Sequence, residues 1–222
     1  MTNNLPADPA TTAIKEAARL AEQFLGKLVN PALEEGGGIL SDTVKFWRFK
    51  NQVNIVLNAR DFLVLKGIEP KQVLPKTLIS ILEAGSLEEE VSMQNRWAAM
   101  LAHAADDTSE SEVLPGYPEI LKQLSQKEVA LLDAFYQEIK GKNKEEREKV
   151  LFDKQKATTF LGISEEKYEV LLENLFRFGL CSPPASRGGV QIGKYPVMLR
   201  TYDSVELTPL GIDFVKSCRY PN

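Results

Sequence analysis

The chain has 222 residues, of which 43% are hydrophobic and 26% charged, so it can bury one sizeable core or two smaller ones. Its formal net charge of −4 argues against a protein built chiefly to coat nucleic acid, which needs clustered Lys and Arg to displace counterions. It contains no run of about 18 apolar residues that could cross a bilayer, and its first residues lack the basic and apolar segments of a secretory signal. We therefore expect a cytoplasmic protein that makes no membrane contact.

The single histidine and the two cysteines offer little material for catalysis. With His103 alone, a two-histidine metal site is impossible and a Ser-His-Asp triad has no second candidate. His103 lies near the end of a predicted helix beside Asp106 and Asp107, where a solvated or capping histidine is the ordinary case. Cys181 and Cys218 lack the paired spacing of a zinc site and are expected to be reduced thiols. We predict no catalytic, metal-binding or cofactor-binding residues, and a protein that is not an enzyme.

The first predicted helix starts at Asp8-Pro9, because Asp can accept from exposed amides and Pro loses nothing at the first helical position. Apolar residues then recur at three- and four-residue steps: Ile14, Ala17, Ala18, Ala21, Leu25 and Leu28. This face can pack on its own bundle or on a second copy, so a homodimer is possible. Gly36, Gly37 and Gly38 end the pattern and are expected to form a hinge, because no Gly-Lys-Ser/Thr signature follows them.

A second helix is predicted from Ser41 or Asp42 to about Lys66, ending at Gly67. One stripe is apolar and includes Phe46, Phe49, Val53, Val56 and Leu57. A second stripe is aromatic and amide-rich: Trp47, Asn51, Asn54 and Asn58. Asn is a poor helix-interior residue, so the second stripe indicates either hydrogen bonds to neighbouring helices or a partner-binding groove. A groove would use these four residues together with Trp97.

A third helix is predicted to begin at Pro75 and to end at Gly85. Ser86 and Glu89 have the spacing of a capping box, which would begin a fourth helix through Trp97. The acidic run Glu88–Glu90 is then expected to be a solvated helix start that favours the helix dipole, because consecutive residues point about 100° apart and cannot share one metal ion. These four helices predict a bundle over residues 1–106.

Residues 107–124 are predicted to form a linker and a short helix, because they are rich in turn formers and acids. Ser125 and Glu128 form a second capping box that opens the predicted domain over residues 125–222. The segment Lys142–Lys149 alternates charge signs and is expected to be solvated or mobile.

The spacing downstream is typical of a helix-turn-helix. A short helix over Asp153–Phe160 is followed by a turn at Gly162 and by a helix over Glu165–Phe178 that Ser164 caps. Strands are then predicted at Leu180-Cys181 and Val205–Leu207, with a tip between them at Arg187–Gly189 and a last helix from Pro209. The predicted fold is therefore mainly α, with an N-terminal helical bundle followed by a C-terminal winged helix that carries a small β wing.

The predicted recognition helix, Glu165–Phe178, is acidic, which disfavours insertion into the major groove because phosphate repels carboxylates. The predicted wing carries Arg187, Lys194 and Arg200 among tyrosines, so nucleic acid could be bound through the wing. The alternative is a winged helix used for packing and protein contact, since the fold alone does not dictate function.

Short motifs along most of the chain carry a family resemblance: Trp47–Asn51, Pro75-Lys76, Ser86–Glu90 leading to Trp97-Ala98, Leu121–Ser125 and Leu207–Gly211. Together they resemble the Abi-alpha family, which is otherwise described as a domain of unknown function. The resemblance implies a bacterial or prophage-encoded protein linked to abortive infection, a form of phage defence, and provides no established catalytic residues.

Three hypotheses follow for the function. We expect a non-enzymatic protein that acts in phage defence through contacts with a protein partner of unknown identity. The first alternative is a nucleic-acid-binding regulator that uses its basic wing. The second is an enzyme with a scattered acidic site, which would require a bound divalent metal or a cleft of perturbed carboxylates.

Overall fold

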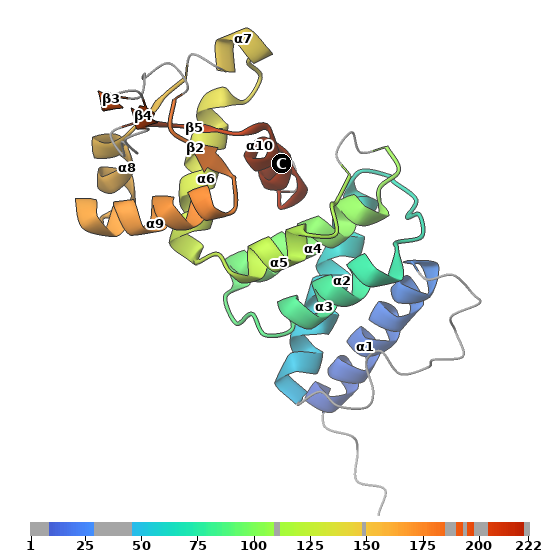
Figure 1. Ribbon diagram of the computed structural model, residues 1–222. Coiled ribbons are helices and arrows are strands. Elements are labelled where there is room, and N and C mark those ends of the chain that lie inside the picture. Colours follow the sequence, from blue (N-terminus) through green and yellow to red (C-terminus); the bar gives the residue numbers. More distant parts are fainter. Residues whose placement is uncertain are drawn as a thin grey trace, which may run out of the picture. The chain divides into compact units, whose positions relative to one another are not determined.

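The computed structural model contains mainly helices and a few short strands (Figure 1), as the sequence predicts. It describes residues 9–28, 46–108, 112–147, 150–184, 190–192, 195–197 and 204–219. The chain divides into two compact units. The first comprises Met1–Lys122 together with Ser217–Asn222, and the second comprises Gln123–Lys216. Within the described ranges, no helix is both long and apolar enough to cross a membrane.

The first unit is a helical assembly in which α2 contacts α1, α3 and α4, and α3 also contacts α4 and α5. Its described helices are α1 (Pro9–Leu28), α2 (Phe46–Leu65), α3 (Pro75–Gly85), α4 (Val91–Ala105) and α5 (Tyr117–Lys122). The most deeply buried side chains come from α2, α3 and α4. They include Ile55, Ile81, Trp97 and Leu101, each at most 1% exposed.

Helix α1 packs on α2 of its own chain through the C-terminal half of its apolar face. Ala21, Phe24 and Leu28 are buried, whereas Ile14 is 37% exposed. The backbone carbonyl of Leu28 also accepts a hydrogen bond from the amide of Val73 at 2.8 Å, which holds the end of α1 beside the segment that leads into α3. The apolar face of α1 therefore has a partner within its own unit, while a homodimer stays a prediction.

Two glycines set the ends of α2 and α3. Gly67 follows α2 with a φ of 66°, which favours glycine because a Cβ is strained there. Helix α3 begins at Pro75 and ends at Gly85, as predicted. A Cβ at Gly85 would lie 2.7 Å from Cδ1 of Ile55 and 3.0 Å from Cγ of Trp97. Glycine at this position therefore allows α3 to approach α2 and α4 closely.

The predicted capping box of Ser86 and Glu89 is wrong. Helix α4 begins at Val91, and its N-cap residue Glu90 makes no side-chain capping bond. The hydroxyl of Ser86 instead donates to the carbonyl of Glu83 at 2.7 Å and accepts from Nε of Arg48 at 3.1 Å. Ser86 is fully buried, so its hydroxyl satisfies groups of α3 and α2 rather than the start of α4. The acidic run accordingly precedes the helix instead of forming its first turn.

The second unit combines helices with short antiparallel strands. Its helices are α6 (Gln126–Ile139), α7 (Lys144–Arg147), α8 (Lys154–Leu161), α9 (Glu165–Arg177) and α10 (Pro209–Ser217). Its described strands are β1 (Phe152–Asp153), β2 (Cys181–Ser182), β3 (Val190–Ile192), β4 (Tyr195–Val197) and β5 (Ser204–Leu207). Strand β5 lies between β1 and β2 in an antiparallel sheet, and β3 pairs with β4 separately.

The predicted capping residues and the predicted turn glycine of these helices are confirmed. Ser125 and Glu128 form the predicted capping box of α6. Gly162 follows α8 with a φ of 59°, and the hydroxyl of Ser164 accepts from the amide of Lys167 at the start of α9. Thus α8 and α9 are joined by the tight turn that the sequence predicts.

Strand β1 was not predicted, because two residues are too few to show an alternating pattern. In the sheet, Phe152 pairs with Val205, and Asp153 pairs with Ser204. Asp153 is also the N-cap of α8, where its carboxylate accepts from the amide of Lys156 at 3.0 Å. The same short segment therefore ends a strand and begins a helix.

The core of the second unit is built on α6, α9 and the sheet. Phe135 of α6 stacks on Phe152 of β1 with ring centroids 4.0 Å apart. Helix α10 approaches the backbone at Leu180 so closely that a Cβ at Gly211 would overlap the Leu180 carbonyl. The hydroxyl of Thr208 accepts from the amide of Gly211 at 2.9 Å, which fixes the start of α10.

Candidate functional site

The amide-rich stripe of α2 divides into an interior part and an outer part. Asn51 is 9% exposed, and its Nδ2 donates to the backbone carbonyls of Ser86 at 3.1 Å and Glu88 at 2.8 Å. Its Oδ1 accepts from Nε2 of Gln94 on α4 at 3.1 Å. Asn51 therefore links α2 to α4 and to the connection between α3 and α4, which is the hydrogen-bonding alternative that the sequence left open.

The other predicted partner-binding residues that the structure describes differ in burial. Asn54 is half-buried, and Asn58 donates from Nδ2 to Oδ1 of Asn95 in an exposed pair at 3.1 Å. Trp97 is 1% exposed and packs in the core, so its ring is not available to a partner, and the proposed surface loses that residue. The side chain of Trp47 lies outside the described residues.

Sequence reasoning missed two buried glutamines in this region. Gln94 donates from Nε2 to the carbonyl of Glu88 at 2.8 Å, beside the bond from Asn51. Gln52 is 3% exposed and donates to the carbonyl of Leu82 at 3.3 Å. A usable signal was present, because Gln52 lies three residues after Phe49 and four before Val56 of the apolar stripe, and Gln94 lies three residues before Trp97, so each shares a helix face with apolar residues.

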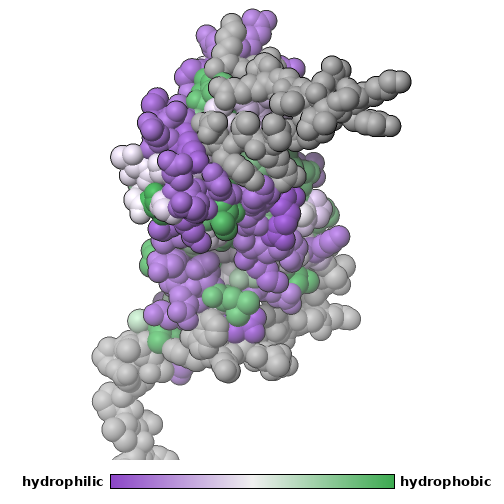
Figure 2. All heavy atoms as spheres, turned by 60° about the vertical axis from the view of Figure 1, so that its left-hand side comes forward, coloured by the Kyte–Doolittle hydropathy of each residue, from purple (hydrophilic) through white to green (hydrophobic). Residues whose placement is uncertain are grey.

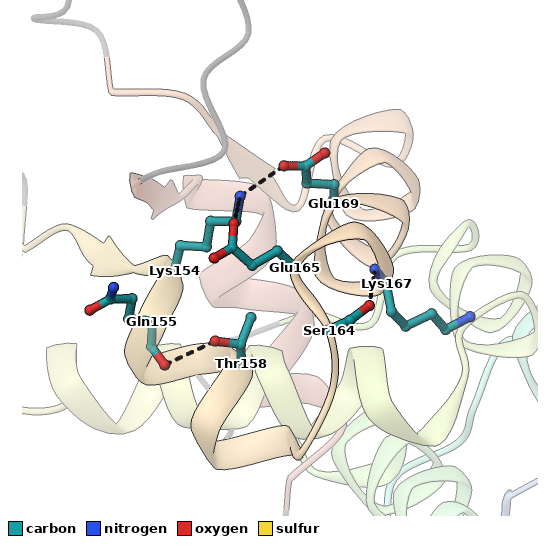
Figure 3. A network of polar contacts seen from close by, with 7 residues as sticks. All are labelled: Lys154, Gln155, Thr158, Ser164, Glu165, Lys167 and Glu169. Carbon is teal, nitrogen blue, oxygen red and sulfur yellow. Dashed lines mark hydrogen bonds and ion pairs between the residues drawn. The ribbon is translucent and has the colours of Figure 1, made fainter.

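A second polar network joins α8 to α9 (Figure 3). The ammonium group of Lys154 lies between the carboxylates of Glu165 and Glu169, at 2.8 Å from each. Hydrogen bonds to the two carboxylates raise the pKa of Lys154, so this side chain stays charged. The Lys154 side chain is 15% exposed, whereas that of Glu165 is 63% exposed. The network therefore fixes the turn between the helices while its carboxylates remain open to solvent.

Helix α9 presents a mixed acidic and apolar face away from the core. Its buried side chains are Tyr168, Leu171, Leu172 and Leu175. Its acidic residues, Glu165, Glu166, Glu169 and Glu173, are exposed or half-buried. A hydrogen bond from its own backbone amide and one from the Ser164 hydroxyl lower the pKa of Glu166. These carboxylates outnumber the nearby ammonium groups of Lys154 and Lys167, and the Lys167 side chain points away from the network (Figure 3).

Two large apolar side chains of α8 and α9 are exposed. Phe160 of α8 is 64% exposed and Val170 of α9 is 60% exposed. The face of the molecule in Figure 2 is mostly hydrophilic where it is described, with hydrophobic residues in small separate groups. Single exposed apolar residues are normal on proteins, and these two lie on helices that a tight turn joins.

The predicted nucleic-acid-binding residues Arg187, Lys194 and Arg200 lie outside the described residues. The described strands nearest to them in sequence are β3 and β4, where Ile192 pairs with Tyr195 on either side of position 194.

The single histidine and the cysteines lie among ordinary structural contacts. Nε2 of His103 is 2.8 Å from the carbonyl oxygen of Arg219 within the first unit. Cys181 and Cys218 are both buried as thiols, and burial raises the pKa of Cys181. In the part of the chain that the structure describes, no three His, Cys, Asp or Glu side chains are grouped so that they could hold a metal ion.

Comparison with known proteins provides one match. No curated protein and no solved structure matches the chain. The sequence model of the family described as "Abortive infection alpha" matches residues 50–218, which is most of the chain and includes α2 to α10 in large part. The resemblance carried by the short motifs is thereby confirmed, and the chain belongs to the Abi-alpha (abortive infection alpha) family.

Proposed function

We propose that this protein acts in abortive infection in the bacterial cytoplasm as a non-enzymatic interaction protein, and that its second unit is a winged helix that contacts a protein partner. Membership of the Abi-alpha family supports the link to abortive infection. The contacts and charges of α8 and α9 support the mode of action.

The order and pairing of elements support a winged-helix arrangement. Helix α6 is followed by β1, the tightly joined pair α8 and α9, strand β2, the returning strand β5 and helix α10. Strand β5 pairs with β1 on one side and with β2 on the other, and these outer strands contact α8 and α9, respectively. In this arrangement α9 is the element that reads DNA in nucleic-acid-binding members of the fold.

The outward face of α9 is the observation that carries the proposal. The four glutamates of α9 outnumber its two cations, Lys167 and Arg177, and Lys154 of α8 is already paired with Glu165 and Glu169. A DNA backbone would repel this face, because binding depends on cations that displace counterions from phosphate. Val170 adds an exposed apolar group at the same helix. The face is therefore complementary to a protein surface with basic and apolar side chains.

The environment of His103 also supports a structural role for this residue rather than one in acid–base catalysis. Its Nε2 contacts a backbone carbonyl oxygen at 2.8 Å, so the imidazole has a defined structural partner. This contact belongs to the first unit, whereas the exposed acidic face belongs to the second.

The decisive experiment is a phage challenge of cells that express Val170→Lys or the matched control Val64→Lys. Both valines are exposed helical residues, at 60% and 68%, so neither substitution disturbs a core. If α9 contacts a protein partner, Val170→Lys should weaken that contact by at least about tenfold in Kd, and the phage titre should rise relative to cells with the unchanged protein. Val64→Lys should protect like the unchanged protein.

The sign of the result separates the two modes of contact. A lysine on α9 would strengthen an interaction with nucleic acid, because it adds a cation to the contact face. Undiminished or increased protection by Val170→Lys, at equal protein levels, would therefore contradict a protein contact through α9.

A wing-based contact with nucleic acid is the alternative proposal, supported by the basic residues that flank β3 and β4 in sequence. The test is charge reversal of all three residues, Arg187→Glu, Lys194→Glu and Arg200→Glu. Nucleic-acid binding through the wing should weaken in this variant and should weaken in the unchanged protein as salt is added. Binding that persists in the triple variant would exclude the wing.

A further inference from the structure

The second unit contains a pocket of about 610 Å³, which is separate from the outward face of α9. Residues from the C-terminal end of α6, from α7, from the sheet and from α10 line it. Pockets that bind small molecules in proteins typically enclose roughly 300–1,000 Å³. The pocket is therefore large enough for an organic ligand.

One wall of the pocket is apolar and well supported. It includes Ile139, Phe152, Leu207 and Ile212. Phe152 is 3% exposed and stacks on Phe135, so its ring is held in place from behind. A rigid apolar wall favours a ligand with a hydrocarbon or aromatic body, because such a body gains contact without ordering the wall.

The polar lining of the pocket carries more positive than negative groups. The cations are Lys144, Arg147 and Lys216, and the carboxylates are Glu206 and Asp213. Glu206 lies 3.3 Å from the hydroxyl of Ser182, which provides that carboxylate with a donor from the protein. The lining therefore retains an excess of positive charge.

The hydroxyl of Thr208, although it lines the pocket, is already engaged. It donates to the carbonyl of Gly179 and accepts from the amide of Gly211. The strongest interactions for an anionic ligand are consequently charge-assisted bonds from Lys216 and from the terminal amino groups of Arg147, whose Nε already donates to the carbonyl of Asn143.

We propose that this pocket binds a small amphipathic anion, in which an apolar body carries one carboxylate, sulfonate or phosphate group. The body would pack on the wall at Phe152 and Ile212, and the anionic group would contact Arg147 and Lys216. The proposal adds a ligand site to the second unit and does not depend on a protein contact through α9.

The test is a fluorescence titration of the full chain with 8-anilinonaphthalene-1-sulfonate, an aromatic sulfonate that becomes fluorescent in apolar sites. The double variant Arg147→Glu, Lys216→Glu should bind this probe at least about tenfold more weakly. The matched control Lys127→Glu reverses an exposed charge on α6 that does not line the pocket and should bind the probe unchanged.

Competition distinguishes an amphipathic-anion site from a merely apolar surface. Decanoate should displace the probe, whereas decyltrimethylammonium, with the same chain and the opposite charge, should not. Equal displacement by the two, or unchanged binding by the double variant, would overturn the proposal. If circular dichroism shows that the double variant is unfolded, Lys216→Gln keeps most of the aliphatic stem and must still weaken binding for the proposal to stand.

Discussion

At the scale of the residue, Gly211 determines how closely α10 can approach the rest of the second unit. Gly211→Ala should destabilise this unit by about 3 kcal/mol or more, because the added methyl group overlaps the backbone carbonyl of Leu180 and no rotamer change relieves it. Urea unfolding followed by far-ultraviolet circular dichroism measures the loss.

Gly26→Ala is the control for this substitution. Gly26 lies in α1, and a Cβ there meets nothing within 4 Å. Alanine is the better helix former, so the variant should gain roughly 0.5–1 kcal/mol. Equal effects of the two substitutions would show that helix propensity, and not the contact at Leu180, governs position 211.

Lys154 provides a second residue-scale prediction, on pH dependence. Its folded-state pKa is raised above the ordinary value of 10.5, so its stabilising charge is fully present below that value and is lost only as the pH rises through the folded-state pKa. Lys154→Met should therefore lower the free energy of unfolding by an amount that stays constant between about pH 6 and pH 9. A difference that shrinks across this range would place the folded-state pKa lower than the ion pairs require.

At the scale of the element, the amide stripe of α2 contains buried hydrogen bonds that hold helices together and an exposed hydrogen bond that contributes little. Asn51→Ala should destabilise the first unit by about 2 kcal/mol or more. The buried carbonyl of Ser86 would lose the hydrogen bond that Asn51 donates, and the side-chain amide of Gln94 would lose the Asn51 oxygen as an acceptor. Asn58→Ala breaks only an exposed pair and should stay within about 0.5 kcal/mol of the unchanged protein.

Tryptophan fluorescence during urea unfolding measures both variants. The chain has two tryptophans, Trp47 and Trp97, and both lie within Met1–Lys122, so the signal reports on the first unit. Similar destabilisation by the two alanine variants would contradict the division of the stripe into an interior and an outer part.

Helix ends were predictable where one short segment contains the whole signal. Ser125 and Glu128 satisfy each other within a single turn, and Gly162 provides the left-handed residue after α8. The same spacing at Ser86 and Glu89 does not form a capping box, because Ser86 is buried and its hydroxyl bonds to Glu83 and Arg48 instead. A buried hydroxyl takes whichever partner the tertiary packing provides, and that choice is not encoded locally.

At the scale of the whole molecule, the chain passes through the second unit and then contributes its last segment to the first. Ser217 and Cys218 are 0% and 3% exposed, and the Arg219 carbonyl contacts His103. In a chain that ends at Lys216, the melting temperature of the first unit should therefore be at least about 4 °C lower than in the full chain. Thermal unfolding monitored by tryptophan fluorescence measures this difference.

A chain that ends at Arg219 retains all three of these residues and is the control. If both truncated chains melt at the same temperature, Ser217, Cys218 and the contact with His103 contribute nothing measurable to the first unit, and its core is complete without the C-terminal segment.

The sequence by itself determined the mainly helical composition, the starts of α3, α6 and α10, the joined helices α8 and α9, and the Abi-alpha family. The structural features among these depend on periodicity, on glycine and proline, and on capping bonds between residues three or four apart. The family depends on short motifs along the chain. Tertiary structure alone decided that Trp97 is buried, that Asn51 bonds across helices, and that Lys154 is held between two carboxylates. Each of these depends on groups brought together by packing, so no local pattern contains it.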